Sequence, residues 1–397
     1  MISLKDFARK CLMPHLVPLA LLIAIGVIYF LPGFQGYSLK QGDMKNAKGM
    51  AGEAIYYHES TGDYAWWNAS MFSGMPNTQI WGDYEGNWSK YIVRLYQVVP
   101  MPFGIWIMAA ICMYIMLIHF SINRWLSLLG ALAYGFSSYL LIIIEVGHVT
   151  KALAYAFMPL VFGGVVLLFQ GKSWRGLLFL SLGMTLELGS NHVQVTYYLG
   201  MLCLIYVIFK AVELAKEKNL KGLVRPALLA AAAVVIAVMS NFPVLYNTLE
   251  YGKFTTRGAS NVTINPDGSS KEADQTDGLD RSYVTAWSYG WQESLSFFIP
   301  NAVGGATGAI GNSKYLEKAD PRFRQNIAQS NHYWGNQSFT SGPVYVGAGI
   351  FLLALLALVF VRGPLKWALF AGAIMSFFLA LGKNFMPLTN FFLDYLP

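Results

Sequence analysis

The hydrophobic residues of this chain fall in long continuous runs, without regular alternation with polar residues. About 20 apolar residues cross a bilayer core of about 30 Å as a helix. Only helices and closed barrels satisfy every backbone polar group in lipid, and unbroken runs do not fit the alternating strands of a barrel. The pattern therefore predicts an all-α polytopic membrane protein. Stretches without Lys, Arg, Asp or Glu include 95–123, 125–144, 152–171, 188–209, 226–249, 343–361 and 367–382.

These runs predict nine transmembrane helices and two long polar loops. The first run follows basic residues and lacks a small-residue cleavage site, so we interpret it as a retained signal anchor. The expected spans are 12–32, 99–119, 125–144, 152–170, 174–189, 193–212, 223–241, 342–361 and 365–382. The expected divisions are a signal-anchor span in 1–32, a first extracytoplasmic loop with interfacial helices in 33–98, a transmembrane core of six spans in 99–241, a second extracytoplasmic loop in 242–341, and two last spans with an outer end in 342–397.

Composition agrees with a membrane location. Of the 397 residues, 55% are hydrophobic and 12% are charged, whereas an ordinary soluble chain is about a quarter charged. The net charge of +7 is explained by position and does not indicate a nucleic-acid partner. With the N-terminus in the cytoplasm, the short cytoplasmic segments hold 13 basic residues and the short outer segments hold two, Lys151 and Lys383, as expected from the positive-inside rule. The 13 are Lys5, Arg9, Lys10, Arg124, Lys172, Arg175, Lys210, Lys216, Lys218, Lys221, Arg225, Arg362 and Lys366.

The sequence lacks the common signatures of disulfide, zinc and nucleotide sites. Cys11, Cys112 and Cys203 lie in or beside apolar runs, so they make no disulfide framework. There is no Walker loop, no HExxH, no CxxC pair, and no GxGxxG after a strand. An enzyme on the outer face would therefore need an activated group delivered by lipid.

Polar groups gather where the expected spans reach the outer side. The stretch LIIIEVGHVTKALAY places Glu145, His148 and Lys151 three residues apart between two apolar runs, and in a continuous helix such residues share a face. The next outer turn carries Asn191, His192 and Gln194. Ionisable groups at membrane depth are expensive and mark functional sites by default. We expect one polar cavity, lined by several helix ends, that opens to the outside.

Structural alternatives apply to each of these groups. The Glu145–His148–Lys151 set also fits a solvated helix end, and His192 fits a satisfied core histidine equally well. For Glu187 the two readings cannot be separated. We interpret the tryptophans of the first loop as interfacial anchors in preference to a sugar-binding platform.

Several motifs together resemble the bacterial YfhO-like membrane proteins of the GT-C superfamily of glycosyltransferases. They are GD at 42–43, WWNASMFSGMP at 66–76, EVGHVTKALAYAFMP at 145–159, SNHVQVTYY at 190–198, SLSFFIPNAVGG at 294–305 and YWGNQSFTSGPVYVGAG at 333–349. Proteins of this type continue with further spans and a further outer region, so the sequence leaves open whether this chain is a truncated form.

The resemblance implies an inverting glycosyltransferase of the bacterial cytoplasmic membrane. Such enzymes move a sugar from a polyprenyl-phosphate carrier to an extracytoplasmic acceptor, such as a cell-envelope polymer, glycan or lipid. In the superfamily an acidic residue soon after the first span is the catalytic base or organises the site, and Asp43 holds that position. Asp63 and Asp83 share the loop but lie farther from the span.

The chemistry of inverting transfer suggests roles for the other polar residues. A carboxylate takes the proton of the acceptor hydroxyl, and positive charge stabilises the leaving phosphate. We expect Lys151, with Arg257 or Arg281, to supply that charge. His148 is expected to donate to the phosphate or orient Asp43, and Glu145 to hold His148 or Lys151 or to bind a metal. No cofactor is certain, and a divalent metal stays open because hard ions prefer carboxylate oxygens.

Two other classes of function compete with the enzyme. A transporter or flippase for a lipid-linked sugar tends to have broken helices at mid-membrane and inverted repeats, whereas the polar groups here sit at one face. A non-catalytic scaffold that binds envelope polymer would leave Asp43 and Glu145 facing bulk water. Release of polyprenyl phosphate from a loaded carrier distinguishes the enzyme from both.

Overall fold

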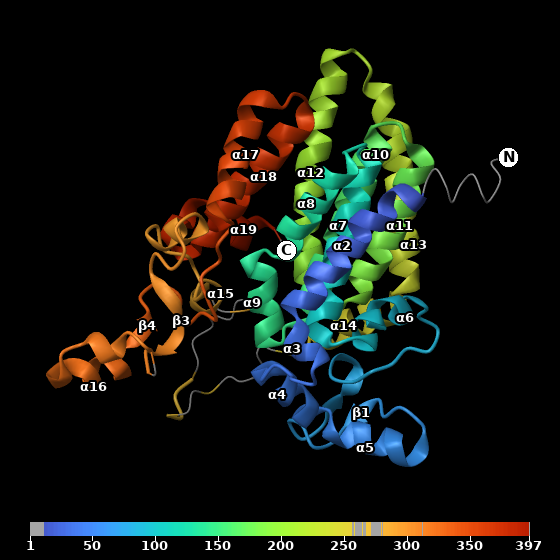
Figure 1. The fold of residues 1–397 in the computed structure, drawn as a ribbon. Coiled ribbons are helices and arrows are strands. Elements are labelled where there is room, and N and C mark those ends of the chain that lie inside the picture. Colours follow the sequence, from blue (N-terminus) through green and yellow to red (C-terminus); the bar gives the residue numbers. More distant parts are fainter. Residues whose placement is uncertain are drawn as a thin grey trace. The chain divides into compact units, whose positions relative to one another are not determined.

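The computed structural model is mostly helical and divides into two compact units. It describes residues 12–255, 258, 264, 267–270, 279, 281–311 and 313–396. Unit 1 comprises Met1–Thr248 with Arg362–Leu369, and unit 2 comprises Leu249–Val361 with Phe370–Pro397. Figure 1 shows the elements of both units.

Unit 1 is a helix bundle with a polar segment at one end. Its helices are α2 (Met13–Tyr29), α3 (Leu31–Phe34), α4 (Gly42–Met50), α5 (Gly52–Thr61), α6 (Ser89–Val93), α7 (Met101–His119), α8 (Arg124–Gly135), α9 (Ser138–Val146), α10 (Val149–Phe169), α11 (Ser173–Gly189), α12 (Val193–Lys216) and α13 (Val224–Ser240). Short 3-10 turns cover Asn77–Gln79, Arg94–Val98 and Leu220–Leu223, and strands β1 (Trp67–Asn68) and β2 (Met75–Pro76) pair antiparallel. Helix α14 (Phe242–Gly252) crosses the boundary into unit 2.

Unit 2 combines short helices with one antiparallel strand pair. Strands β3 (Gly304–Ala309) and β4 (Asn331–Tyr333) pair with Gly304 opposite Tyr333. The helices are α15 (Arg281–Val284), α16 (Pro321–Gln329), α17 (Ala348–Phe360), α18 (Pro364–Leu381), whose first residues belong to unit 1, and α19 (Met386–Tyr395). The 3-10 turns are Glu293–Phe297, Leu316–Lys318 and Gly382–Phe385. The buried Glu293 carboxylate accepts hydrogen bonds from the Tyr333 hydroxyl and, at 2.7 Å, from Gln337 Nε2. These bonds connect the 3-10 turn that begins at Glu293 with the end of β4 and the residues after it.

The expected count of nine spans is not confirmed. In the described residues, five helical segments are long and apolar enough to cross a membrane: Met101–His119, Val149–Phe169, Val193–Lys216, Leu220–Ser240 and Pro364–Tyr395. A sixth results if α8 and α9 count as one span, although they meet at a bend of 43°. Helices α2 and α11 have 17 residues and α17 has 13. At 1.5 Å per residue these reach about 26 and about 20 Å, short of a bilayer core of about 30 Å. The chain is thus a helical membrane protein with fewer full-length spans than its apolar runs suggest.

Helix α10 forms the centre of unit 1, and glycines let its neighbour α11 approach closely. A Cβ on Gly164 would lie 2.5 Å from the backbone nitrogen of Leu180, and one on Gly183 would lie 2.8 Å from that of Val161. Small residues at such crossings let backbones pack without intervening side chains. The contact fixes α10 and α11 against each other, and α7 packs on α10 as well.

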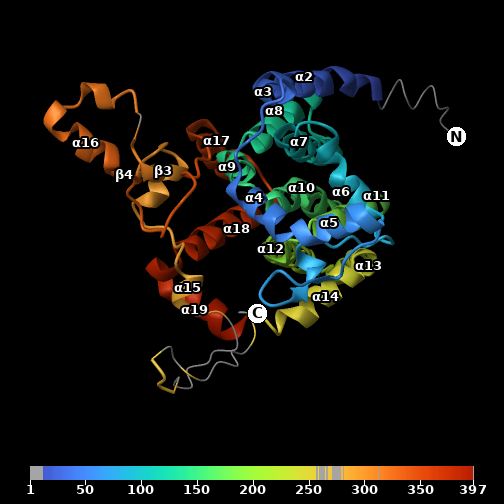
Figure 2. The same cartoon turned by 90° about the horizontal axis from the view of Figure 1, so that it is seen from below.

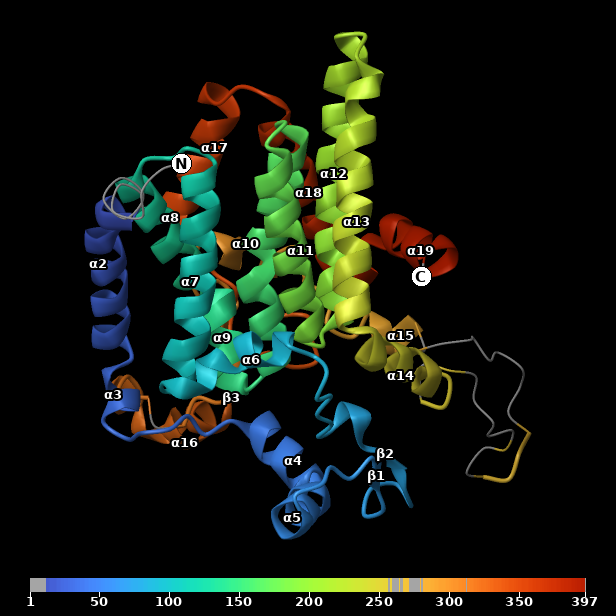
Figure 3. The ribbon, with the colours of Figure 1, turned by 90° about the vertical axis from the view of Figure 1, so that its right-hand side faces the viewer.

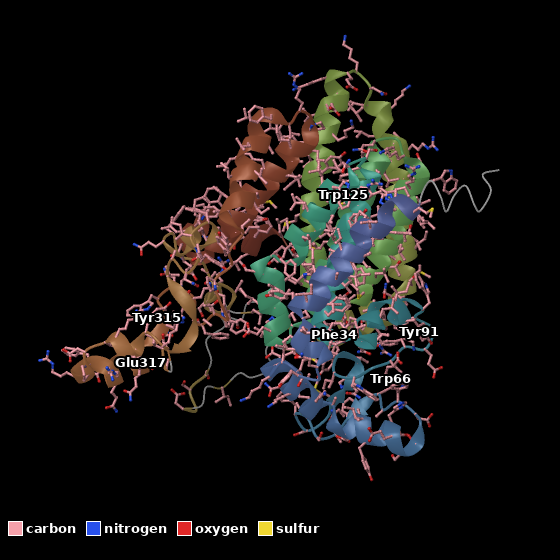
Figure 4. All side chains as sticks on the ribbon, in the orientation of Figure 1. Phe34, Trp66, Tyr91, Trp125, Tyr315 and Glu317 are labelled. Atoms are coloured by element: carbon pink, nitrogen blue, oxygen red, sulfur yellow. The ribbon has the colours of Figure 1, made fainter. Side chains whose placement is uncertain are left out.

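The helices of unit 1 alternate in direction, so the turns before α10 and α12 lie at the same end of the bundle. Figure 3 shows α4, α5, β1 and β2 at this end. Figure 2, which looks onto it, shows α4 and α5 in front of the ends of α10 and α11. Trp66 and Phe34 are labelled at this end and Trp125 at the other (Figure 4). The turns at the other end carry Arg124, Lys172, Arg175, Lys216, Lys218, Lys221 and Arg225.

Candidate functional site

Asp43 stands in the first turn of α4, close to the end of the bundle. Gln41, two residues before Asp43, is only 6% exposed. Its side-chain amide donates to the backbone carbonyl of Ile144 in α9. This contact holds the start of α4 against α9. A carboxylate in the first helical turn is also stabilised by the positive end of the helix dipole. The local sequence therefore places the Asp43 side chain at a helix N-terminus.

A tight turn between α9 and α10 presents His148. Gly147 has a φ of +97°, a left-handed conformation that glycine adopts readily. The N–H groups of Gly147 and His148 donate to the carbonyls of Ile144 and Ile143 at 3.2 and 2.9 Å, which closes the end of α9. A Cβ at this glycine would lie 3.1 Å from side-chain carbons of Gln41 and Met44. The absence of a side chain at Gly147 thus lets the segment around Asp43 pack against the turn that carries His148.

Asp43 and His148 form the central contact of the site. His148 Nε2 lies 2.7 Å from Asp43 Oδ2, and both side chains are partly exposed. Burial and the positive charge of Lys151 lower the pKa of His148 below its ordinary value of 6.5, although Asp43 acts in the opposite direction. The ring is therefore neutral at neutral pH, and its Nε2–H donates to the carboxylate. One oxygen of Asp43 is oriented in this way, and among the described residues its second oxygen has no hydrogen-bond partner.

Lys151 adds a cation to this group. It lies in the first turn of α10, partly buried, and its charge interacts with both Asp43 and His148. The first-turn N–H groups of a long helix carry partial positive charge and favour anions. The start of α10 therefore combines a carboxylate, a neutral imidazole and an ammonium group next to an electropositive helix end.

Contrary to the prediction, Glu145 does not contact His148 or Lys151 in the described part of the chain. The chain does not continue as one helix through Gly147, so residues 145 and 148 do not share a helix face. In the described part of the chain, Glu145 makes no hydrogen bond or ion pair with His148 or Lys151, and it is exposed. It lines a mostly apolar cavity of about 340 Å³ together with residues of α2, α3, α9, the segment after α3 and the start of α7.

The turn between α11 and α12 places two of its three predicted residues toward other segments. The His192 ring lies 3.4 Å from Thr150 Oγ1 in α10, next to Lys151. Asn191 donates to Gln79 Oε1 of the first loop at 2.9 Å. Gln194 donates to Tyr198, within its own helix, at 3.1 Å. His192 thus lies beside the start of α10, and Asn191 tethers the first loop.

Of the two predicted arginines, one lies outside the described residues and the other belongs to unit 2. Arg257 lies outside the described residues. Arg281 belongs to unit 2, where its guanidinium pairs with Asp394 and donates to Asn390 at 3.2 Å. Asp83, the lower-ranked acid of the first loop, pairs with Lys90 at 2.9 Å and Arg94 at 3.3 Å.

Sequence reasoning missed the glutamines and left Glu187 undecided. Gln41 and Gln79 hold the first loop on the bundle, and a hydropathy pattern carries no signal for such partners. Glu187 is fully buried, and its Oε2 accepts from Thr196 at 2.7 Å. Among the residues that the structure describes, no three His, Cys, Asp or Glu side chains gather as a metal site.

No protein-family model matches the chain, and neither a curated protein nor a solved structure matches it. A function for this site is therefore argued from its own residues.

Proposed function

We propose that this protein is an inverting glycosyltransferase that moves a sugar from a polyprenyl-phosphate carrier to an extracytoplasmic acceptor, such as an envelope polymer or lipid. The observation that carries the proposal is the grouping of Asp43, His148 and Lys151 at the start of α10. A base and a cation side by side, at the end of a helix bundle, suit a reaction between a lipid phosphate and a water-soluble hydroxyl.

Asp43 serves as the base. In a single displacement the acceptor oxygen bonds to the anomeric carbon while the bond from that carbon to the phosphate oxygen breaks. The electron pair leaves with polyprenyl phosphate, and the acceptor proton passes to the carboxylate oxygen that His148 does not hold. General base catalysis of this kind contributes typically about 10²- to 10⁴-fold.

Lys151 and the start of α10 bind the phosphate. Negative charge grows on the bridging oxygen as the sugar leaves, and preorganised donors at that point stabilise the transition state. The Lys151 ammonium and the α10 N-terminus together provide such donors. The prenyl chain lies in the surrounding lipid.

The charge of the two bundle ends supports an outer location for the site. The end opposite Asp43 carries Arg124, Lys172, Arg175, Lys216, Lys218, Lys221 and Arg225 in its turns. Basic residues in short connections mark the cytoplasmic side. The protein then lies in the bacterial cytoplasmic membrane with its site on the outer face.

The test uses the purified full chain in liposomes with polyprenyl-phosphate glucose and polyprenyl-phosphate N-acetylglucosamine as donors. Release of polyprenyl phosphate by the wild type, and its loss in Asp43→Asn, is the expected result. Movement of intact donor across the bilayer without cleavage overturns the proposal in favour of a flippase. Binding without cleavage or movement overturns it in favour of a scaffold.

A further inference from the structure

A second cavity lies in unit 1, outside the group of Asp43, His148 and Lys151. Its volume is about 690 Å³, within the range of about 300–1,000 Å³ that is typical of ligand pockets. Residues of the first loop between 62 and 88 form most of its wall, and Met239, Ser240 and Pro243 at the junction of α13 and α14 complete it. It faces the same end of the bundle as β1 and α5.

Four aromatic side chains line this cavity: Tyr64, Trp66, Tyr84 and Trp88. Trp66 and Trp88 are 47% and 46% exposed, so much of their apolar ring surface stays open. The rings of Trp66 and Tyr84 lie 5.2 Å apart at 49°. The Tyr84 hydroxyl accepts from Asn247 at 2.9 Å, and the Tyr64 hydroxyl donates to Asp83 at 3.0 Å. The two tyrosines are therefore held in place, and the Tyr64 ring also stacks on His58 at 4.3 Å. The open ring surface of the cavity belongs mainly to Trp66 and Trp88.

Three carboxylates accompany these rings, and they differ in how they are used. Asp83 is buried and committed to Lys90, Arg94 and Tyr64. Its burial alone would raise its pKa, but these partners outweigh burial and lower the pKa, so it is ionised at neutral pH. Asp63 and Glu85 are exposed, and in the described part of the chain their carboxylates accept no hydrogen bond. Two acceptors therefore stand unused at the wall of an aromatic cavity.

The cavity is held in place by buried amides. Asn87 Nδ2 donates to Asn241 Oδ1 at 2.9 Å, and Asn241 donates to the carbonyl of Thr185 in α11 at 3.0 Å. Asn87 Oδ1 in turn accepts from the N–H of Ser89 at 3.0 Å. Trp88 lies between Asn87 and Ser89, so the hydrogen bonds of both neighbours hold its backbone in place. A site of this kind is preformed and loses little conformational freedom on binding.

We propose that this cavity binds a pyranose unit of a glycan. A pyranose has apolar C–H faces that pack on aromatic rings and hydroxyls at its rim that donate to carboxylates. On this proposal Trp66 and Trp88 bind sugar in place of anchoring the loop at the lipid interface, because both rings line one cavity beside two exposed carboxylates. A phosphate or other anion is repelled by Asp63 and Glu85. The binding site stands independently of the transfer reaction at Asp43.

The test measures saturation-transfer NMR and isothermal titration with the full chain in detergent micelles. The probes are the methyl glycosides of glucose, galactose and N-acetylglucosamine, with choline as a cationic competitor. We expect at least one glycoside to bind, and Trp66→Ala to weaken its binding about tenfold or more, because the substitution removes one of the aromatic surfaces that contacts the sugar. Trp66→Phe is expected to retain most of the binding.

The matched control is Trp67→Ala. Trp67 is the next residue, 57% exposed, and it does not line the cavity, so its removal leaves binding unchanged. A double variant, Asp63→Asn with Glu85→Gln, removes the two unused anions with little change of shape and is expected to weaken the glycoside. Binding of choline in place of every glycoside, no binding of any glycoside, or equal affinity in wild type and Trp66→Ala each overturns the proposal.

Discussion

Asp43 Oδ2 lies 2.7 Å from His148 Nε2, although one residue follows the first apolar helix and the other precedes the central one. Two backbone features bring them together: the left-handed turn at Gly147 and the amide of Gln41 on the Ile144 carbonyl. Lys151 lies one turn into the same helix that His148 precedes. The chemistry assigned to this site depends on that approach, and each link in it can be changed separately.

Asp43→Asn is expected to lower the rate of sugar transfer by about 10²-fold or more, because it removes the base but keeps the shape and the contact with His148. The measurement is the release of polyprenyl phosphate per enzyme. Glu59→Gln, in the exposed part of α5, is the control and should keep the wild-type rate. Equal turnover in Asp43→Asn and wild type would remove this residue from the mechanism.

Lys151→Ala is expected to raise KM for the lipid donor about 10- to 100-fold, because a hydrogen bond to a charged group contributes about 1.5–3 kcal/mol. Asp43→Asn should change that KM less. Lys151→Arg keeps the charge and should retain most of the affinity. Lys48→Ala in exposed α4 serves as the control, and an unaltered KM in Lys151→Ala would contradict phosphate binding by this lysine.

The protonation of His148 provides a test that needs no substrate. We expect its pKa, measured by NMR on histidine-labelled protein, to lie below 6.5, because burial and Lys151 disfavour the charged ring. Lys151→Ala should raise this pKa and Asp43→Asn should lower it further. The unfolded chain binds the proton more readily, so acidification from pH 7.5 to below 6.5 should lower the free energy of unfolding. His148→Gln should reduce that pH dependence, and a pKa above 6.5 would show that the ion pair dominates.

Gly147→Ala should destabilise the turn that presents His148. A left-handed conformation costs a non-glycine residue about 1–2 kcal/mol, and the added Cβ would press on Gln41 and Met44. Thermal unfolding and transfer activity should both fall. Gly200→Ala is the comparison, since a Cβ there meets nothing within 4 Å; a similar loss of stability in both variants would argue against a special role for the turn.

Asn241→Ala should loosen the first loop. It removes the acceptor for Asn87 and the donor to the Thr185 carbonyl, and each buried polar group left unpaired costs about 1–3 kcal/mol. Limited proteolysis within residues 62–88 should become faster, and thermal stability should drop. The neighbouring Ser240→Ala, which loses a bond only to its own helix, should change stability by less than about 0.5 kcal/mol.

The helical class and the crowding of polar groups at one end could be predicted, because both follow from charge-free runs and from the direction in which successive helices run. The bend between α8 and α9 could not. Its run, 125–144, is free of charged residues throughout, and the break occurs where Ser137 caps α9 by accepting from the N–H of Leu140. A hydropathy pattern does not distinguish a serine that caps the start of a helix from a serine within a helix.

The site was only partly predictable for a similar reason. The sequence suggested that His148 orients Asp43 or donates to phosphate, and the structure brings these two residues into contact with Lys151 nearby. The sequence also predicted that Glu145 and His148 share one helical face. The structure shows that they do not, because the turn at Gly147 ends α9 between them. The partners that hold the loop, Gln79 with Asn191 and Asn87 with Asn241, join residues remote in the chain, and one sequence does not encode which distant amide meets which.

The close crossing of α10 and α11 bears on how a substrate enters. The backbones of α10 and α11 pack closely at Gly164 and Gly183. We therefore expect α10, the helix that carries Lys151, to stay fixed against α11, because sliding would make the two backbones clash. The amides of Gln41, Gln79 and Asn87 instead hold the first loop to α9, to the turn after α11 and to the end of α13. If the proposed transfer takes place at this site, we expect the lipid donor to enter by displacement of the segment that carries Asp43, and not by separation of α10 from α11.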